Sequence, residues 1–205
     1  MNARLLAGCI AVLLALSGTG TAALAQHAHQ PAPAAAAPSR SQSLYALSAT
    51  LVDHEGHSVG LDLFRGHPVL ISMFYSSCPD ACPLLIASIQ RIESELSARE
   101  RGNLRVVLVS LDPERDTREA LQALARARGL DESRWRLLRA ENDTVREVAA
   151  ALGIKYRRLP DGSFNHSSVI TLLDRSGVVQ VRIDGIGKPQ ADLLRRLRAA
   201  AASPP

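Results

Sequence analysis

Apolar residues along this chain follow two patterns, one typical of buried strands and one typical of amphipathic helices. The runs PVLISMFY (68–75) and LRVVLVSL (104–111) are continuous and of strand length, as expected for central strands buried on both faces of a sheet. The segment SSVITLLDRSGVVQVRID (167–184) predicts a strand, a turn and a second strand. Upstream, ATLVDHEGHSVGLDL (49–63) predicts a β-hairpin with Gly56 in its turn.

Helical periodicity follows the first continuous run. An apolar stripe with spacings of four, three and four residues predicts a helix, and Pro83 suits its first turn because no N–H is needed there. The stripe consists of Leu85, Ile89, Ile92 and Leu96. The other expected elements are helices over 118–128, 144–152 and 188–200 and a short strand at 135–138.

Strands that alternate with helices, ending in a hairpin and a helix, indicate an α/β fold around a mixed β-sheet. Two cysteines, Cys78 and Cys82, lie between the first continuous strand and the following helix, where helix N-terminal N–H groups stabilise thiolates. This placement narrows the fold class to a thioredoxin-like fold, with helices flanking the central sheet and an N-terminal β-hairpin extension. We expect the domain to span 44–200, followed by a disordered tail at 201–205.

The first 25 residues have the three parts of a secretory signal peptide. Arg4 gives a basic start, 5–16 is apolar, and the small residues at 23–25 favour cleavage before Gln26. We therefore expect an exported, periplasmic protein, in a compartment where disulfides persist. An uncleaved N-terminal membrane anchor is the alternative.

The segment 26–43, QHAHQPAPAAAAPSRSQS, is rich in Ala and Pro and lacks apolar periodicity. Such a composition predicts a flexible linker outside the folded domain. His27 and His29 are expected to be solvated linker residues, with transient metal binding as the alternative.

Composition excludes some functional classes. The chain has 205 residues, 46% of them apolar, which suffices for one domain with a sizeable core. Aromatic residues make up only 3%, which disfavours a base-stacking surface for nucleic acid. The formal net charge of +4 is not concentrated in a block of like charges, so we expect an ordinary solvated surface.

Cys78 and Cys82 are spaced so that both side chains project from the same side of a helical turn. Two sulfur atoms placed in this way can form a disulfide or share a soft metal ion. A purely structural disulfide is disfavoured, because so short a loop constrains the unfolded chain little. Redox exchange and metal binding therefore remain. Three intervening residues, one more than in thioredoxin-type reductants, relax the geometry towards chelation.

His166, in SFNHSSVITLLD, directly precedes the strand predicted to begin near Ser168. In thioredoxin-like folds the loop before that strand lies beside the cysteine turn, so His166 is the candidate third ligand. Two thiolates and one imidazole suit copper, with zinc second. Zinc would require a fourth protein ligand. The candidates for that ligand are His54, His57 and His67, which we expect on loop surfaces.

Three motifs together resemble the Sco/SenC family of copper-binding, thioredoxin-like proteins of cytochrome oxidase assembly. They are FYSSCPDACPLL (74–85), VSLDPERDT (109–117) and FNHSSVITLLDRSG (164–177), in the family's order. The resemblance implies an extracytoplasmic metallochaperone that holds one Cu(I) or Cu(II) ion through Cys78, Cys82 and His166. It further implies delivery of copper to a cytochrome c oxidase copper-site subunit or exchange with another copper chaperone. Such a protein is expected to be a monomer, with membrane-surface association.

The sequence departs from the family pattern at two places. Ser76 and Ser77 precede the first cysteine, where aromatic or bulky polar residues are common, and the N-terminus resembles a cleaved signal where the family usually has an anchor. Asp112 and Asp116 could tune the site or contact the partner. We favour capping of the next helix by this DPERDT loop, because Asp and Thr oxygens accept free N–H groups at helix starts. Asp80 is either a polar loop residue or an acceptor near the ligands.

The leading hypothesis is a metallochaperone without enzymatic turnover. The alternative is a thiol–disulfide oxidoreductase, with Cys78 and Cys82 as the redox-active pair that reduces the copper-ligand cysteines of a partner protein. His166 discriminates between them, because a copper carrier needs the imidazole and a dithiol reductant does not. Trp135 and Tyr156 are expected to serve in packing.

Overall fold

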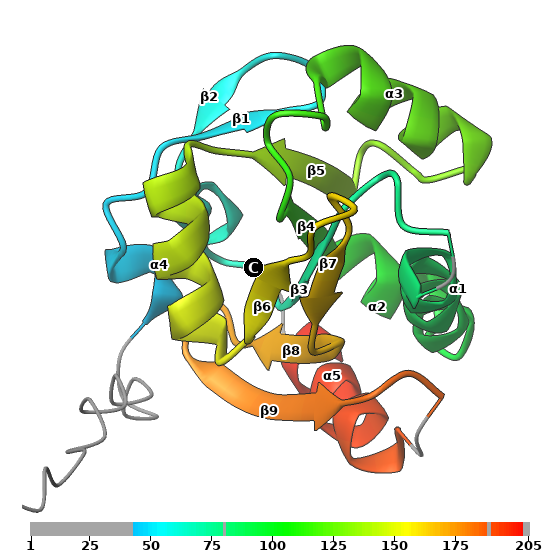
Figure 1. The fold of residues 1–205 in the computed structure, drawn as a ribbon. Coiled ribbons are helices and arrows are strands. Elements are labelled where there is room, and N and C mark those ends of the chain that lie inside the picture. Colours follow the sequence, from blue (N-terminus) through cyan, green and yellow to red (C-terminus); the bar gives the residue numbers. More distant parts are fainter. Residues whose placement is uncertain (1–42, 80, 188–189, 203–205) are drawn as a thin grey trace, which may run out of the picture. The chain divides into compact units, whose positions relative to one another are not determined.

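The computed structural model describes residues 43–79, 81–187 and 190–202 (Figure 1). The expected signal peptide, His27, His29, Asp80 and almost all of the linker lie outside these residues. Within the described part, no helix is both long and apolar enough to cross a membrane.

A seven-stranded mixed sheet forms the centre of the domain, in the order β2-β1-β5-β4-β3-β8-β9. Its middle strands β3, β4 and β5 are parallel, whereas β1 and β8 pair antiparallel with β5 and β3. The strands are β1 (Leu51–Asp53), β2 (Ser58–Val59), β3 (Val69–Phe74), β4 (Arg105–Ser110), β5 (Trp135–Arg139), β8 (Val169–Leu173) and β9 (Val179–Asp184). The sheet confirms the predicted α/β, thioredoxin-like fold class.

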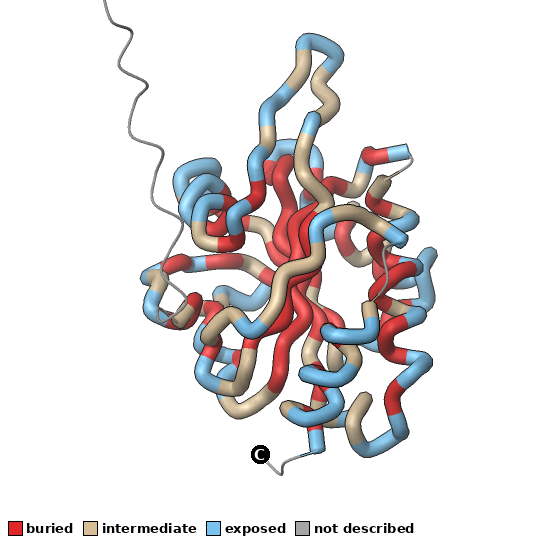
Figure 2. Tube along the Cα trace, turned by 90° about the horizontal axis from the view of Figure 1, so that it is seen from below, coloured by how far each residue is buried: buried red, intermediate tan, exposed pale blue. Residues whose placement is uncertain are grey.

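The continuous apolar runs are explained by cores on both faces of the sheet. Along β3, Leu70 and Phe74 pack with helices α1 (Ala81–Ser94), α3 (Arg118–Ala127) and α5 (Ala191–Ala202). The alternate residues Val69, Ile71 and Met73 pack against α4 (Asn142–Leu152) and the 3₁₀ turns η1 (Leu44–Ala46) and η2 (Leu61–Phe64). Buried residues accordingly follow the central strands in Figure 2, and exposed residues lie mainly around them.

Most predicted elements are present, with shifted ends. The hairpin β1–β2 turns at Gly56, which has a positive φ of 95°. Its second arm is shorter than expected, because residues 61–64 form the 3₁₀ turn η2. Helix α5 begins at Ala191 and runs through Ala202. The prediction of a disordered tail from residue 201 is therefore wrong for residues 201 and 202. Burial of Ala201 against the core holds this last turn in the helix.

The elements that were not predicted include one helix and one β-hairpin. Helix α2 (Ala98–Asn103) begins with a capping box formed by Ser97 and Glu100. Apolar periodicity could not predict this helix, because it buries no residue. Strands β6 (Tyr156–Arg158) and β7 (Phe164–His166) form a separate antiparallel hairpin. His166 therefore ends a strand of this hairpin and does not lie in a loop before β8.

Candidate metal centre

The candidate centre lies at the carboxyl edge of the parallel strands. Strands β3 and β4 are paired to their ends, Phe74 opposite Ser110, so the loops that follow them are neighbours. The first loop leads into α1 and carries Cys78, with Cys82 in the first turn of the helix. The second leads through Asp112 and Asp116 into α3.

Cys78 and Cys82 are not joined in a disulfide, and both are buried, with 8% and 3% of their surfaces exposed. The backbone N–H of Cys82 donates to the sulfur of Cys78 at 3.3 Å. The backbone N–H of Tyr75 donates to the sulfur of Cys82 at 3.5 Å. The two sulfurs are thus held on the same side of the turn, as the spacing predicted.

Burial works against ionisation of these thiols. It raises the pKa of Cys82 far above its ordinary value, and the nearby Cys78 and Asp116 add to the increase, although the N–H of Tyr75 opposes it. The expectation that the helix N-terminus would stabilise a thiolate is therefore wrong for Cys82, since desolvation outweighs the N–H groups. A metal ion must displace the thiol proton in order to bind.

His166 is suited to be a neutral ligand. Burial lowers its pKa, so the imidazole is uncharged at neutral pH. Its Nδ1 lies 3.2 Å from the carbonyl oxygen of Ser167, and a carbonyl can only accept, so Nδ1 carries the hydrogen. This arrangement leaves the lone pair of Nε2 for an ion, as is usual for histidine ligands oriented by a backbone carbonyl.

Cys78 and His166 line the same pocket, of about 390 Å³. The remaining wall comes from the cysteine loop and the β6–β7 hairpin, namely Tyr75, Pro79, Ala81, Asp161, Ser163, Phe164 and Asn165. Among the described residues, however, the ligand atoms of Cys78, Cys82 and His166 do not all lie within 4.8 Å of one another. Zinc–sulfur bonds are about 2.3 Å, so a shared ion of similar size would require side-chain rotation towards a common point.

A buried carboxylate fixes the cysteine loop. Asp116 is 0% exposed, and both its oxygens accept from the backbone N–H of Ser76 at 3.1 Å. It also accepts from the hydroxyls of Ser76 and, at 2.5 Å, Ser110. Burial raises the pKa of Asp116, and these hydrogen bonds partly offset the increase. Asp116 therefore joins the two loops.

The prediction that the DPERDT loop caps the next helix is confirmed, although the cap is its last residue and not Asp112 or Asp116. Thr117 is the N-cap of α3 and accepts from the N–H of Ala120 at 3.3 Å. Asp112 forms an ion pair with Arg115. Sequence reasoning missed the structural role of Asp116 because the contact with Ser76 spans 40 residues. The two unusual serines before Cys78 could have suggested such a contact.

The three histidines considered as a fourth zinc ligand do not line the pocket shared by Cys78 and His166. His54 is 0% exposed, so its expected place on a loop surface is wrong: its ring accepts from the N–H of Leu137 at 3.4 Å. His67 is partly buried beside Asn103 and Arg105. His57 is exposed, as predicted.

A second group of potential ligands lies in the β1–β2 turn. Ligand atoms of Asp53, Glu55 and His57 are mutually within 4.8 Å, the one such group among the described residues. Arg136 contacts both carboxylates, at 3.9 Å from Asp53 and 3.6 Å from Glu55. Backbone N–H groups of residues 55 and 57 also bond one oxygen of Asp53. The carboxylate charge is thus partly compensated by Arg136 and these N–H groups.

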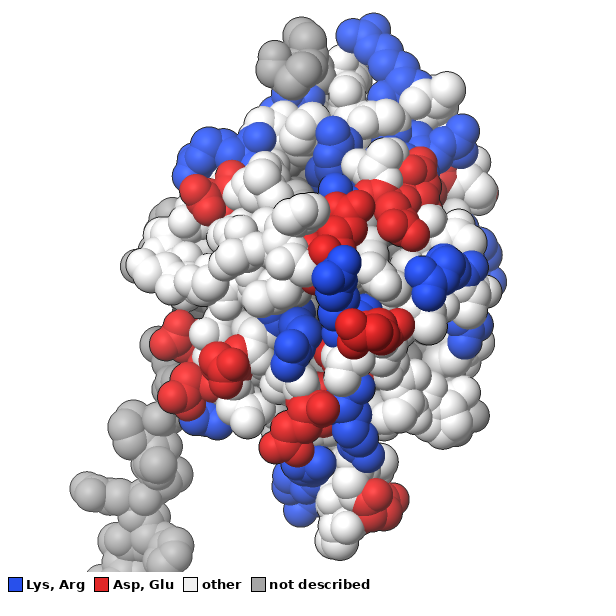
Figure 3. Space-filling view, turned by 90° about the horizontal axis from the view of Figure 1, so that it is seen from above, with Lys and Arg blue, Asp and Glu red and all other residues white. Residues whose placement is uncertain are grey.

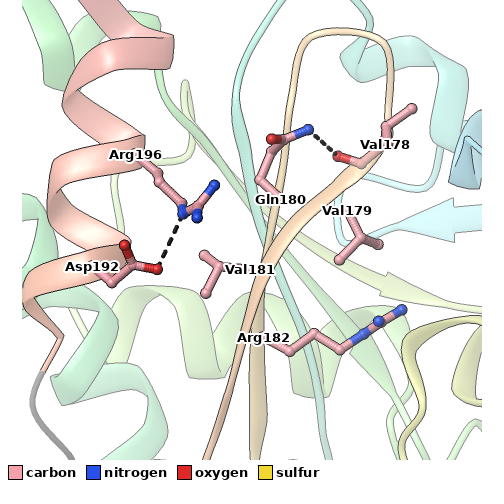
Figure 4. Close-up of a pocket in the computed structure, with 7 residues that line it drawn as sticks. All are labelled: Val178, Val179, Gln180, Val181, Arg182, Asp192 and Arg196. Atoms are coloured by element: carbon pink, nitrogen blue, oxygen red, sulfur yellow. Dashed lines mark hydrogen bonds and ion pairs between the residues drawn. The ribbon is translucent and has the colours of Figure 1, made fainter. Parts of the chain in front are cut away.

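A larger groove between β9 and α5 is lined by no cysteine or histidine (Figure 4). It is lined by residues 178–182 with Asp192 and Arg196, and these two form an ion pair at 3.1 Å. Acidic and basic side chains are interspersed over the face shown in Figure 3, in agreement with the expected mixed surface. Trp135 is buried and donates to Glu93 at 3.0 Å, which confirms its packing role.

Comparison with known proteins identifies the family. The SCO1/SenC family model matches residues 38–202. This chain belongs to the SCO1/SenC family. A SCO2-like protein of Rickettsia prowazekii is 27% identical over 133 residues, which cover 62% of this chain and 63% of the relative. The human mitochondrial SCO2 homolog is 31% identical over 62% of this chain and 49% of its own length. The chain thus spans less than two thirds of these relatives.

Solved structures support the fold of this SCO1/SenC chain. A putative electron transfer protein from Aquifex aeolicus superposes with a TM-score of 0.69 at 23% identity, covering 78% of this chain and 94% of the other. A SCO1/SenC family lipoprotein from Bacillus anthracis gives 0.68 at 21% identity, covering 74% and 92%. Yeast Sco1, solved with copper bound, gives 0.63 at 19% identity, covering 76% and 87%.

Proposed function

We propose that this SCO1/SenC protein is a metallochaperone that binds one copper ion through Cys78, Cys82 and His166 and delivers it to a copper site of cytochrome c oxidase. The observation that carries the proposal is that Cys78 and the neutral imidazole of His166 line one pocket, while the buried Cys82 donates its backbone N–H to the sulfur of Cys78. Relatives add support: one is named a putative copper-binding protein of Stutzerimonas stutzeri, and another is described as a member of the Sco family of cytochrome c oxidase assembly proteins.

The donor set fits copper by its chemistry. Two thiolates favour Cu(I), and the added imidazole makes a site that can also hold Cu(II). The thiol of Cys82 is protonated before loading, because burial raises its pKa. Loading therefore releases protons, and affinity should rise with pH. Burial of the sulfurs also limits access by other thiols and oxidants, which suits a carrier that must retain its cargo until it meets a partner.

Copper titration of the purified, reduced domain tests the binding step. We expect one equivalent of Cu(I) or Cu(II) per chain and a sulfur-to-copper charge-transfer band with Cu(II). Loss of copper to a weak chelator such as histidine, with no charge-transfer band, would reject the site. The same titration at pH 6 and pH 8 should show tighter binding at the higher pH.

A thiol–disulfide oxidoreductase is the second candidate function, because the two cysteines lie one turn apart and the backbone N–H of Cys82 donates to the sulfur of Cys78. The two roles can be separated by measuring oxidase activity in cells that depend on this protein. A carrier with His166→Ala should fail to mature the oxidase at limiting copper and recover when copper is in excess. Full oxidase activity with His166→Ala, but none with Cys78→Ser, would favour the reductase.

We also propose that the protein acts outside the cytoplasm after removal of residues 1–25. The sequence pattern of that segment carries this proposal, and one structural relative is described as a lipoprotein. N-terminal sequencing of the exported protein should begin at Gln26. A membrane-retained chain of full-length mass would instead support an anchor.

A further inference from the structure

The imidazole of His166 is carried by a small hairpin that is separate from the central sheet. Strands β6 and β7 form a two-stranded sheet of their own, in which His166 lies opposite Tyr156. A two-stranded hairpin is marginally stable by itself, so contacts with the rest of the domain must hold it. On the cysteine side, the ring of Phe164 packs on that of Tyr75, with centroids 5.2 Å apart. The position of the imidazole therefore depends on what fixes this hairpin.

The turn of the hairpin is held by the loop after β4 (111–117). The guanidinium of Arg115 donates through one nitrogen to the carbonyl oxygen of Gly162 and through another to the carboxylate of Asp112. Asp112 is 1% exposed, so its carboxylate is a fixed partner that orients the arginine. A Cβ added at Gly162 would lie 3.1 Å from a terminal nitrogen of Arg115, which shows how closely the two segments meet. One planar guanidinium can bridge two acceptors because its N–H groups point in different directions.

A second contact joins the same two segments. Arg158, on β6, donates to the carboxylate of Glu114 at 2.8 Å. The guanidinium of Arg158 also lies over the ring of Phe164, 5.9 Å from its centroid. Arg158 and Glu114 are both exposed, and exposed ion pairs stabilise a structure little. The contact from Arg115 should therefore hold the hairpin more strongly.

The loop after β4 thus contacts both segments that carry the proposed ligands, through consecutive residues. Asp116 accepts from the N–H of Ser76 in the cysteine loop, whereas Glu114 and Arg115 hold the hairpin. We propose that this loop sets the separation between the thiols and the imidazole, and that Arg115 is the positioning residue for His166. The effect on copper binding rests on the proposed function. The attachment of the hairpin does not.

Replacement of Arg115 should weaken only the metal binding that uses the imidazole. Two thiolates suffice for Cu(I), whereas Cu(II) favours an added nitrogen ligand. We expect Arg115→Ala to lower the Cu(II) affinity about tenfold, as is typical when a residue that orients a ligand is removed, and to leave the Cu(I) affinity unchanged. In a His166→Ala background, Arg115→Ala should not change the Cu(II) affinity further, because the arginine acts through the imidazole.

The attachment of the hairpin is measured without metal, by amide hydrogen exchange of the reduced protein. The probes are the N–H groups of Leu159 and Ser167, which bond between the two arms of the hairpin. Arg115→Ala should speed their exchange about tenfold, whereas the amides of β3 and β4 should keep their wild-type rates. The matched control is Arg195→Ala, which removes an arginine paired with an aspartate at the same three-residue spacing on α5. This control should match the wild type in both measurements.

A second variant guards against general destabilisation, because Arg115→Ala leaves the buried Asp112 without its ion-pair partner. Glu114→Ala removes the exposed contact with Arg158 and leaves no buried charge unpaired. It should change the Cu(II) affinity and the hairpin exchange in the same directions as Arg115→Ala, by about twofold.

The two measurements separate this inference from the proposed function. Faster exchange confined to the hairpin of Arg115→Ala, in a wild-type protein that binds no copper, would support the attachment and reject the copper carrier. In a wild-type protein that binds copper, an unchanged Cu(II) affinity in Arg115→Ala would overturn the positioning role and leave the carrier intact. An equal loss of Cu(II) affinity with and without His166 would also overturn it. Faster exchange throughout β3 and β4 would do the same, because general destabilisation would then explain the effect.

Discussion

Two groups of potential metal ligands lie in different parts of the molecule, and they differ in what already contacts them. Asp53, Glu55 and His57 are close together, but Arg136 and backbone N–H groups already contact their carboxylates. Cys78 and His166 line one pocket from different elements, and no arginine or lysine is among the described residues that line it. Proximity of ligand atoms alone does not rank the two groups, because a protein cation beside a carboxylate weakens the attraction of that carboxylate for a metal ion.

The largest expected effect comes from the cysteines. Cys78→Ser or Cys82→Ser should abolish the Cu(II) charge-transfer band and weaken copper binding at least about a thousandfold, roughly 4 kcal/mol, because a hydroxyl is a hard and weakly acidic ligand. Asp53→Asn is the control from the other group and should leave both measurements unchanged. Tight copper in the double serine variant would instead place the site elsewhere.

Removal of the Asp116 carboxylate, which joins the cysteine loop to the loop after β4, should have the next largest effect. Asp116→Ala leaves the N–H of Ser76 and the hydroxyl of Ser110 without their acceptor in a buried place. We expect a loss of about 2–3 kcal/mol in the free energy of unfolding, measured with urea. Asp161→Ala is the control: Asp161 is an exposed residue of the pocket that Cys78 and His166 line, and its replacement should change stability by less than about 0.5 kcal/mol. Equal losses in the two variants would contradict the role of Asp116.

His166→Ala should have an intermediate effect on metal binding and little effect on stability. Two thiolates suffice for Cu(I), whereas Cu(II) loses a preferred nitrogen ligand. We expect Cu(II) affinity to fall about 10- to 100-fold, or roughly 1.4–2.7 kcal/mol, with Cu(I) largely retained in competition with a chromophoric chelator. Unchanged Cu(II) binding would mean that the third ligand is another residue.

The smallest effect concerns acid stability at the β1–β2 turn. Desolvation would raise the pKa of Asp53, but N–H groups of His57 and Glu55 and the His57 ring hold it below its ordinary value. Because the pKa is lower in the folded state, the ionised carboxylate stabilises the protein at pH values above the unfolded-state pKa, which is near 4. This contribution disappears as the pH falls through the folded-state pKa. Asp53→Asn should thus cost about 1 kcal/mol at pH 7 and less at pH 3. Thermal unfolding at both pH values measures this, and a pH-independent loss would contradict it.

The sequence by itself determined most of the elements and the order of the motifs. Continuous apolar runs such as 68–75 predicted β3 correctly, because a strand buried on two faces cannot alternate with polar residues. The apolar stripe that begins at Leu85 predicted the buried face of α1, because residues three and four apart lie on the same side of a helix. These features depend on neighbours within a few residues, which periodicity reports directly.

Only the tertiary structure decided what surrounds the candidate ligands. The bond from Ser76 to Asp116, the packing of Tyr75 on His166 and the burial of His54 against β5 all join segments at least 40 residues apart. The high pKa of Cys82 likewise follows from burial by the whole domain and not from its position at a helix start. Local pattern cannot report such contacts, because they depend on which loops meet when β3 and β4 pair in parallel.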